Sequence, residues 1–128
     1  MSVFVSAFTL VVPDYDEAIA FYVETLGFVL QEDVQLNPDK RWVRIAPEGA
    51  QASILLAKAD SSDQVAAIGK QCGGRVGFFL QSDDFEADHA RLTEKGVRFV
   101  EEPRQESYGT VAVFSDIFGN LWDLIQPK

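Results

Sequence analysis

The stretch Asp14-Tyr15-Asp16-Glu17-Ala18 is followed, 69 residues later, by the similar stretch Asp83-Asp84-Phe85-Glu86-Ala87. The same offset aligns Gly27 with Gly96. Five of the 19 positions between residues 14 and 32 are then identical, where random composition would give about one. Such self-similarity indicates that one structural unit is present twice in the chain.

Each unit predicts a strand, a helix and three further strands. An apolar strand over Val3–Val12 precedes a helix capped by Asp14, and a strand over Val76–Gln81 precedes a helix capped by Asp83. In both places an Asp is followed by Glu three residues later, which is a capping pattern. We therefore expect an α+β protein made of two tandem βαβββ modules. The remaining strands are expected at residues 28–34, 41–46, 52–58, 97–101, 110–115 and 121–126.

The length of 128 residues suits a single domain. Module one should span about residues 1–58, a linker residues 59–73 with a short helix near 64–69, and module two about residues 74–128. Neither half could bury its own strands in isolation.

The composition excludes some classes of partner and indicates the cellular compartment. The formal net charge of −9 argues against nucleic acid and membrane surfaces. No apolar run is long enough to span a bilayer, and no signal peptide is recognisable. With Cys72 as the one cysteine, we expect a cytoplasmic protein.

Three stretches resemble the vicinal oxygen chelate superfamily, which includes glyoxalases, extradiol dioxygenases and bleomycin resistance proteins. They are Val12-Pro13-Asp14, the helix from Ala18 to Phe28, and the closing segment from Phe114 to Leu124. The resemblance implies that the modules form a cupped eight-stranded mixed sheet around a central cavity. It also implies a homodimer.

Enzymes of that superfamily hold a divalent metal with side chains from the first and last strand of each module. The corresponding positions here are Ala7, Ile54 or its neighbour Leu55, Gly77, and Asp123. Only Asp123 could ligate a metal, and one carboxylate does not make a tight transition-metal site. We therefore expect no cofactor, with a divalent metal as the alternative.

Strand alternation predicts which residues face the cavity. The set is mostly apolar and aromatic with a few polar groups, as is common in sites for organic molecules. Its members are Thr9, Trp42, Arg44, Phe79, Gln81, Asp123 and, in a loop at the mouth, Tyr108. Arg44 and Asp123 could instead pair with each other, the other aromatic members could be core residues, and Tyr108 could be an ordinary loop aromatic.

The other titratable residues have ordinary interpretations. His89, the one histidine, is expected on the surface of the second helix or partly buried there. Glu101-Glu102 and Glu32-Asp33 are interpreted as solvated strand ends, and Cys72 as an inert linker residue.

Three functions fit these features. The first is a metal-free protein that binds a small, partly apolar organic ligand. The second is a divalent-metal-dependent lyase, isomerase or extradiol-type dioxygenase that uses a reduced site around Asp123. The third is a protein whose pocket is filled by side chains and in which only dimerisation matters.

Overall fold

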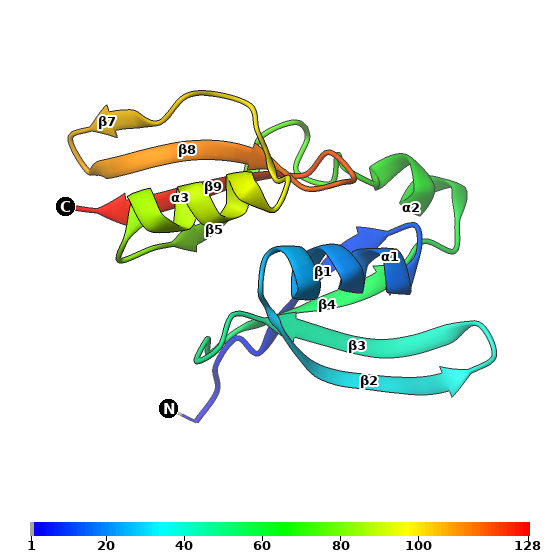
Figure 1. Ribbon diagram of the computed structural model, residues 1–128. Coiled ribbons are helices and arrows are strands. Elements are labelled where there is room, and N and C mark those ends of the chain that lie inside the picture. Colours follow the sequence, from blue (N-terminus) through cyan, green and yellow to red (C-terminus); the bar gives the residue numbers. More distant parts are fainter. Residues whose placement is uncertain (1) are drawn as a thin grey trace. The chain divides into compact units, whose positions relative to one another are not determined.

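The computed structural model describes residues 2–128 (Figure 1). Their contacts divide the chain into two compact units, one up to Ile68 and the other Gly69–Lys128. The boundary lies within the expected linker, and the linker helix α2 (Ser62–Ala67) belongs to the first unit. Each unit contains one sheet and one main helical segment, so the α+β class and the tandem modules are confirmed.

The first unit forms a four-stranded sheet in the order β1-β4-β3-β2. Strands β1 and β4 are parallel, and the other neighbours are antiparallel. The expected start of the first strand at Val3 is wrong. Strand β4 begins at Ser53, opposite Ala7, so it has no residues with which residues 3–5 could pair. The elements are β1 (Ala7–Val12), α1 (Tyr15–Ile19), η1 (Ala20–Thr25), β2 (Val29–Asn37), β3 (Lys40–Ala46) and β4 (Ser53–Lys58).

The helical segment of the first unit changes its winding halfway along. Asp14 caps α1 by accepting a hydrogen bond from the backbone N–H of Glu17 at 2.9 Å. The next segment, η1, is a π-helix, and the N–H of Leu26 bonds the carbonyl of Phe21 five residues back. A π-turn accommodates one more residue than an α-turn. Gly27 then ends the segment with φ of 85°.

The second unit forms a five-stranded sheet in the order β5-β9-β8-β6, with β7 also paired to β8. The strand expected at 97–101 is shortened to β6, and β7 is a further strand that was not expected, so the two sheets contain nine strands among residues 2–128 rather than eight. The elements are β5 (Val76–Gln81), α3 (Phe85–Glu94), β6 (Arg98–Phe99), β7 (Arg104–Glu106), β8 (Gly109–Ser115) and β9 (Leu121–Pro127).

The interruption between β6 and β7 has a local cause. Pro103 has no N–H with which to continue the ladder along β8. At the interruption the side chain of Glu101 accepts the N–H of Val113 at 3.2 Å. At this point of β8 a carboxylate oxygen, and not a backbone carbonyl, accepts the N–H of Val113.

The helix cap of the second unit differs from the expectation. Asp84, not Asp83, caps α3, and its side chain accepts the N–H of Ala87 at 3.3 Å. The backbone N–H of Asp84 in turn donates to the hydroxyl of Ser82 at 3.0 Å. From Asp84 to Gly96 the segment is one residue shorter than from Asp14 to Gly27, which is the residue that the π-turn accommodates.

Each helix covers one face of its own sheet (Figure 1). The core of the first unit lies on that face, and Leu10, Val43 and Leu56 are buried there. In the second unit Trp122 stacks against Phe114, with ring centroids 5.9 Å apart. Between residues 2 and 128, no helix is long and apolar enough to cross a membrane.

The cap assignment predicts unequal effects of two neighbouring substitutions. Asp84→Ala should lower the free energy of unfolding by about 1 kcal/mol, because an N-cap hydrogen bond is lost. The matched variant Asp83→Ala should change it by less than about 0.5 kcal/mol. Urea unfolding followed by circular dichroism measures both, and a larger loss for Asp83→Ala would contradict the assignment.

Candidate functional site

In each sheet the face opposite the helix carries the residues that the sequence predicts as cavity-facing. In the first unit the register places Thr9, Leu55 and Arg44 side by side across β1, β4 and β3. The residues that follow or precede these by one position, Leu10, Leu56 and Val43, lie on the opposite face and are buried under the helix. Trp42 lies two residues from Arg44 on β3 and is 39% exposed. Thr9, Trp42 and Arg44 therefore lie on the uncovered face of the first sheet.

The guanidinium of Arg44 is held inside the first unit. Its Nη1 donates to Glu32 Oε1 at 2.9 Å, and its Nε donates to the hydroxyl of Ser53 at 2.8 Å. Its Nη2 lies 3.5 Å from the carbonyl oxygen of Ser6. Glu32 is thus the ion-pair partner of Arg44 and not merely a solvated strand end. Asp33 is likewise engaged, in a 2.7 Å ion pair with Arg41.

In the second unit, the uncovered face of the sheet has an aromatic edge and a charged edge. Phe79, Asp123 and Val113 are neighbours across β5, β9 and β8. The side chain of Phe79 is 66% exposed. Gln81, two residues after Phe79 on the same face, is also exposed. Asp123 therefore lies in the middle of an open sheet face, beside an exposed ring.

The carboxyl group of Asp123 has an oxygen atom that lacks a hydrogen-bond partner among residues 2–128. Its Oδ1 is buried and has no hydrogen-bond partner among residues 2–128. Desolvation raises the pKa of Asp123, the negative charge of Glu101 raises it further, and the positive charge of Arg104 acts in the opposite direction. A carboxylate here costs folding free energy because it has lost water without gaining a donor.

A charged group at the β7 edge adjoins Asp123. Arg104 Nε donates to both carboxylate oxygens of Glu101, at 2.9 and 3.1 Å, and Arg104 Nη1 donates to Glu106 at 2.7 Å. These bonds, with a further one to Tyr108, raise the pKa of Arg104. We call Glu101, Arg104, Glu106 and Asp123 the Asp123 cluster.

Sequence reasoning missed Glu101 and Arg104 as parts of this face. Glu101 was expected to be a solvated strand end, but its oxygens bind the Val113 N–H and Arg104. The signal that could have identified it is Pro103, because a proline interrupts a strand, and where the pairing stops a side chain can bind the backbone of β8. Tyr108, 53% exposed in the β7–β8 turn, reaches the same group through Arg104.

The residues at the superfamily's metal positions do not form a ligand set. The register places Leu55 on the open face, whereas Ile54 pairs with the buried Ile45 on the helix face, so Leu55 is the matching position. Ala7, Leu55 and Gly77 offer no donor side chain. Within the described residues 2–128, no three His, Cys, Asp or Glu side chains group closely enough to bind a metal ion. Asp123 alone does not fit a catalytic divalent metal.

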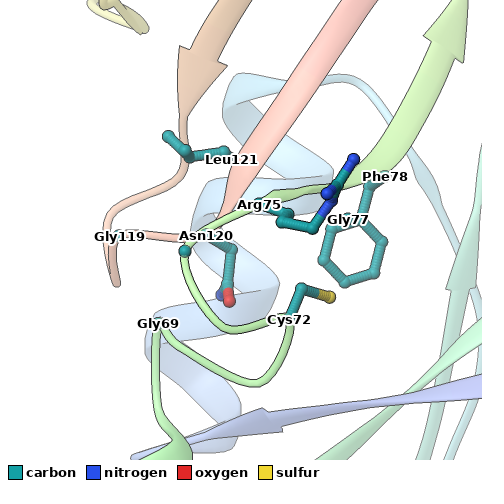
Figure 2. A pocket seen from close by; sticks show the side chains of 9 residues that line it. Gly69, Cys72, Arg75, Gly77, Phe78, Gly119, Asn120 and Leu121 are labelled. Atoms are coloured by element: carbon teal, nitrogen blue, oxygen red, sulfur yellow. The ribbon is translucent and has the colours of Figure 1, made fainter.

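At Gly77 the space for a ligand side chain is already occupied. A Cβ atom added there would lie 2.3 Å from Sγ and 3.1 Å from Cβ of Cys72. Figure 2 shows Cys72 beside Gly77 in a small pocket of the second unit, near Arg75 and Asn120. Cys72 therefore has a packing role that its place in the expected linker did not suggest.

His89 is partly buried, which is one of the two placements that the sequence predicts. Its ring centroid lies 4.1 Å from that of Phe99 and 5.6 Å from that of Phe85. Its Nε2 is buried without a hydrogen-bond partner in the described chain. A surface depression of about 580 Å³ adjoins it, beside Val97. That depression contains none of the expected ligand-binding residues.

The close approach of Cys72 makes a testable prediction. Gly77→Ala should lower the free energy of unfolding by about 1–2 kcal/mol, because the new methyl group displaces the Cys72 side chain. In a Cys72→Ala background, Gly77→Ala should cost less, since Sγ is gone. Equal costs in both backgrounds, measured by urea unfolding, would contradict the contact.

The desolvated carboxyl group predicts a stabilising substitution. Because the pKa of Asp123 is higher in the folded than in the unfolded chain, its ionisation opposes folding above the ordinary aspartate pKa. Asp123→Asn should therefore raise Tm at pH 7 by about 2 °C. This rise in Tm should vanish as the pH falls below 3.8, the ordinary pKa of an aspartate.

Glu94→Gln, which removes the same charge from the exposed surface of α3, is the control and should leave Tm within about 1 °C. Scanning calorimetry from pH 3 to pH 8 measures both variants. A lower Tm for Asp123→Asn at pH 7 would contradict this description of the site.

Known proteins match nearly the whole chain. The family model of the glyoxalase/bleomycin resistance protein/dioxygenase superfamily matches residues 5–124. An uncharacterized protein of Shewanella frigidimarina (strain NCIMB 400) is 54% identical over 119 residues, which are 91% of this chain and 88% of that protein. The uncharacterized protein YurT of Bacillus subtilis (strain 168) is 32% identical over 121 residues, or 92% and 94% of the two chains.

Solved structures agree with this relationship. TnmS3, described as an antibiotic binding protein from Streptomyces sp. CB03234, is 37% identical, with a TM-score of 0.80 over 100% of this chain and 99% of that chain. UcmS2 is 32% identical, with a TM-score of 0.84 over 98% of each chain. The chain therefore belongs to the glyoxalase/bleomycin resistance protein/dioxygenase superfamily.

Proposed function

We propose that this protein binds a small, partly apolar organic molecule, of the kind represented by antibiotics, without using a metal ion. The observation that carries the proposal is the open face of the second sheet, where the exposed Phe79 ring lies beside the partly buried, unsatisfied carboxyl group of Asp123. An apolar surface with a few placed polar groups is typical of sites for organic ligands.

The first unit supplies a second surface of the same character. Trp42 is exposed beside Arg44, whose guanidinium is fixed by Glu32 and Ser53. A fixed charge and an exposed indole can orient a ligand with little loss of side-chain entropy. Thr9 adds a hydroxyl group to this face.

The antibiotic-binding description of TnmS3, 37% identical to this chain, supports this function. The residues at the metal positions support its metal-free character, because alkyl side chains and a glycine cannot polarise a substrate oxygen. We further infer that the protein acts as a cytoplasmic homodimer, as its resemblance to the superfamily implies.

A thermal-shift screen tests the function. An antibiotic that binds only the folded protein should raise Tm by about 5–10 °C at 100 times its Kd. Phe79→Ala and Trp42→Ala should reduce that shift, whereas Val65→Ala, which removes an exposed apolar side chain from α2, should not.

The same screen with added Mn²⁺, Ni²⁺ or Zn²⁺, and with EDTA, separates binding from metal-dependent catalysis. The shift should be unchanged by either addition. Stoichiometric metal together with turnover of a screened compound would contradict the proposal, and so would the absence of any shift across a broad antibiotic panel.

A further inference from the structure

We propose that Arg41 is a positioning residue for the open face of the first unit: it ties the β2–β3 hairpin to α1 and so holds the indole of Trp42 in one orientation. This inference rests on the proposed function, in which Trp42 contacts the ligand. It adds a residue that the ligand does not touch, because the Arg41 side chain reaches Asp16 on the helix, on the other face of the sheet.

Trp42 lies where the first sheet narrows to two strands. Register pairs between β3 and β4 end at Val43 among residues 2–128, so Trp42 has a register partner, Val34, on β2 and none on β4. A two-stranded ribbon is only marginally stable by itself in water. The orientation of Trp42 therefore depends on what else holds this part of the hairpin.

The backbone of Arg41 is held by α1. Its N–H donates to the hydroxyl of Tyr15 at 3.2 Å, and Tyr15 is buried at the start of α1. A side-chain oxygen of the helix thus accepts a strand N–H beyond the last pair with β4. Because successive residues of a strand point to opposite faces, fixing the backbone at Arg41 also fixes the direction in which the Trp42 side chain leaves the strand.

The guanidinium of Arg41 joins the hairpin to the helix a second time. Its Nε and Nη2 donate to the two carboxylate oxygens of Asp33 on β2, at 3.1 and 2.7 Å, and its Nη1 donates to Asp16 on α1 at 2.8 Å. Its Cζ lies 5.2 Å from the centroid of the Tyr15 ring, within the range of a cation–π contact. A two-pronged arginine–carboxylate pair has a defined geometry, so these contacts orient the side chain.

The contacts of Arg41 differ in strength because the partners differ in exposure. The side chain of Asp33 is 30% exposed, whereas that of Asp16 is 79% exposed. Ion pairs with well-exposed groups contribute little to stability. The link from the hairpin to α1 therefore depends mainly on the ring and the hydroxyl of Tyr15, and less on Asp16.

An ordered Trp42 would favour ligand binding. The indole is 39% exposed, so its own packing leaves much of it in contact with solvent. Binding a ligand to a mobile side chain costs the entropy of immobilising that side chain. If Arg41 holds the strand in place beforehand, that cost is largely met during folding rather than during binding.

The mobility of the Trp42 indole tests the inference without any ligand. The chain has two tryptophans, so ¹⁵N relaxation of the indole N–H groups compares Trp42 with the buried Trp122 as an internal control. We expect Arg41→Gln to lower the order parameter of the Trp42 indole from about 0.8 to below about 0.6. Lys40→Gln, which removes the same charge from an exposed position in the same hairpin, should leave it unchanged.

Milder substitutions separate the contacts. Tyr15→Phe keeps the ring but removes the acceptor of the Arg41 N–H, so the Trp42 indole should become more mobile although every charge remains. Asp16→Asn should have a smaller effect. Arg41→Lys keeps the charge but cannot form the two-pronged pair, so it should not restore the wild-type order parameter. Tyr15→Phe also decides the question if Arg41→Gln does not fold.

Binding of 1-naphthol, titrated by NMR, connects the positioning of Trp42 to ligand binding. We expect Arg41→Gln to weaken binding by about 3- to 10-fold, and Trp42→Ala to weaken it as well. In a Trp42→Ala background, Arg41→Gln should have no further effect, because the side chain to be positioned is gone. A general structural role of Arg41 would weaken binding equally in both backgrounds.

The inference would be overturned by an unchanged Trp42 order parameter in both Arg41→Gln and Tyr15→Phe, or by an equal loss of affinity with and without Trp42. No binding of 1-naphthol to a protein whose indole loosens would support the tie between Arg41 and Trp42 but overturn its role in binding. The antibiotic screen shows separately whether the proposed function itself fails.

Discussion

Each sheet of this protein has to bury one face, and each does so under the helix of its own module. Because strand side chains alternate, that single requirement determines which residues stay on the other face. Leu10, Val43 and Leu56 are buried in the first unit, and so Thr9, Leu55 and Arg44 remain on the uncovered side. The candidate site follows from the packing of the core.

The polar groups on the uncovered faces differ in how well they are satisfied. Arg44 has acceptors on three sides, from Glu32, Ser53 and Ser6. Asp123 has a buried oxygen without a donor among residues 2–128, and the guanidinium of Arg104 is bound to other carboxylates. Well-satisfied groups rigidify a surface, whereas an unsatisfied one lowers stability and is retained most readily where a ligand uses it. The first module thus provides a rigidly held positive charge at Arg44, and the second provides a hydrogen-bond acceptor without a donor at Asp123.

The positions that hold a metal in enzymes of the superfamily carry other side chains here. Alkyl groups replace two ligands, and at Gly77 the side chain of Cys72 lies where a third ligand would begin. In the function proposed above, recognition would come from apolar contact and from the carboxylate of Asp123.

The sequence by itself determined the doubling, the α+β class, most strand positions and the alternation that identifies Thr9, Trp42, Arg44 and Asp123, because these depend on local periodicity and capping. It could not place the cap at Asp84, since the π-turn in the other module shifts the repeat by one residue. Nor could it show that Glu101 accepts the N–H of Val113, that Arg104 is engaged, or that Cys72 covers Gly77. Those contacts join residues whose distance and orientation only the tertiary structure decides, because they depend on strand register and side-chain packing.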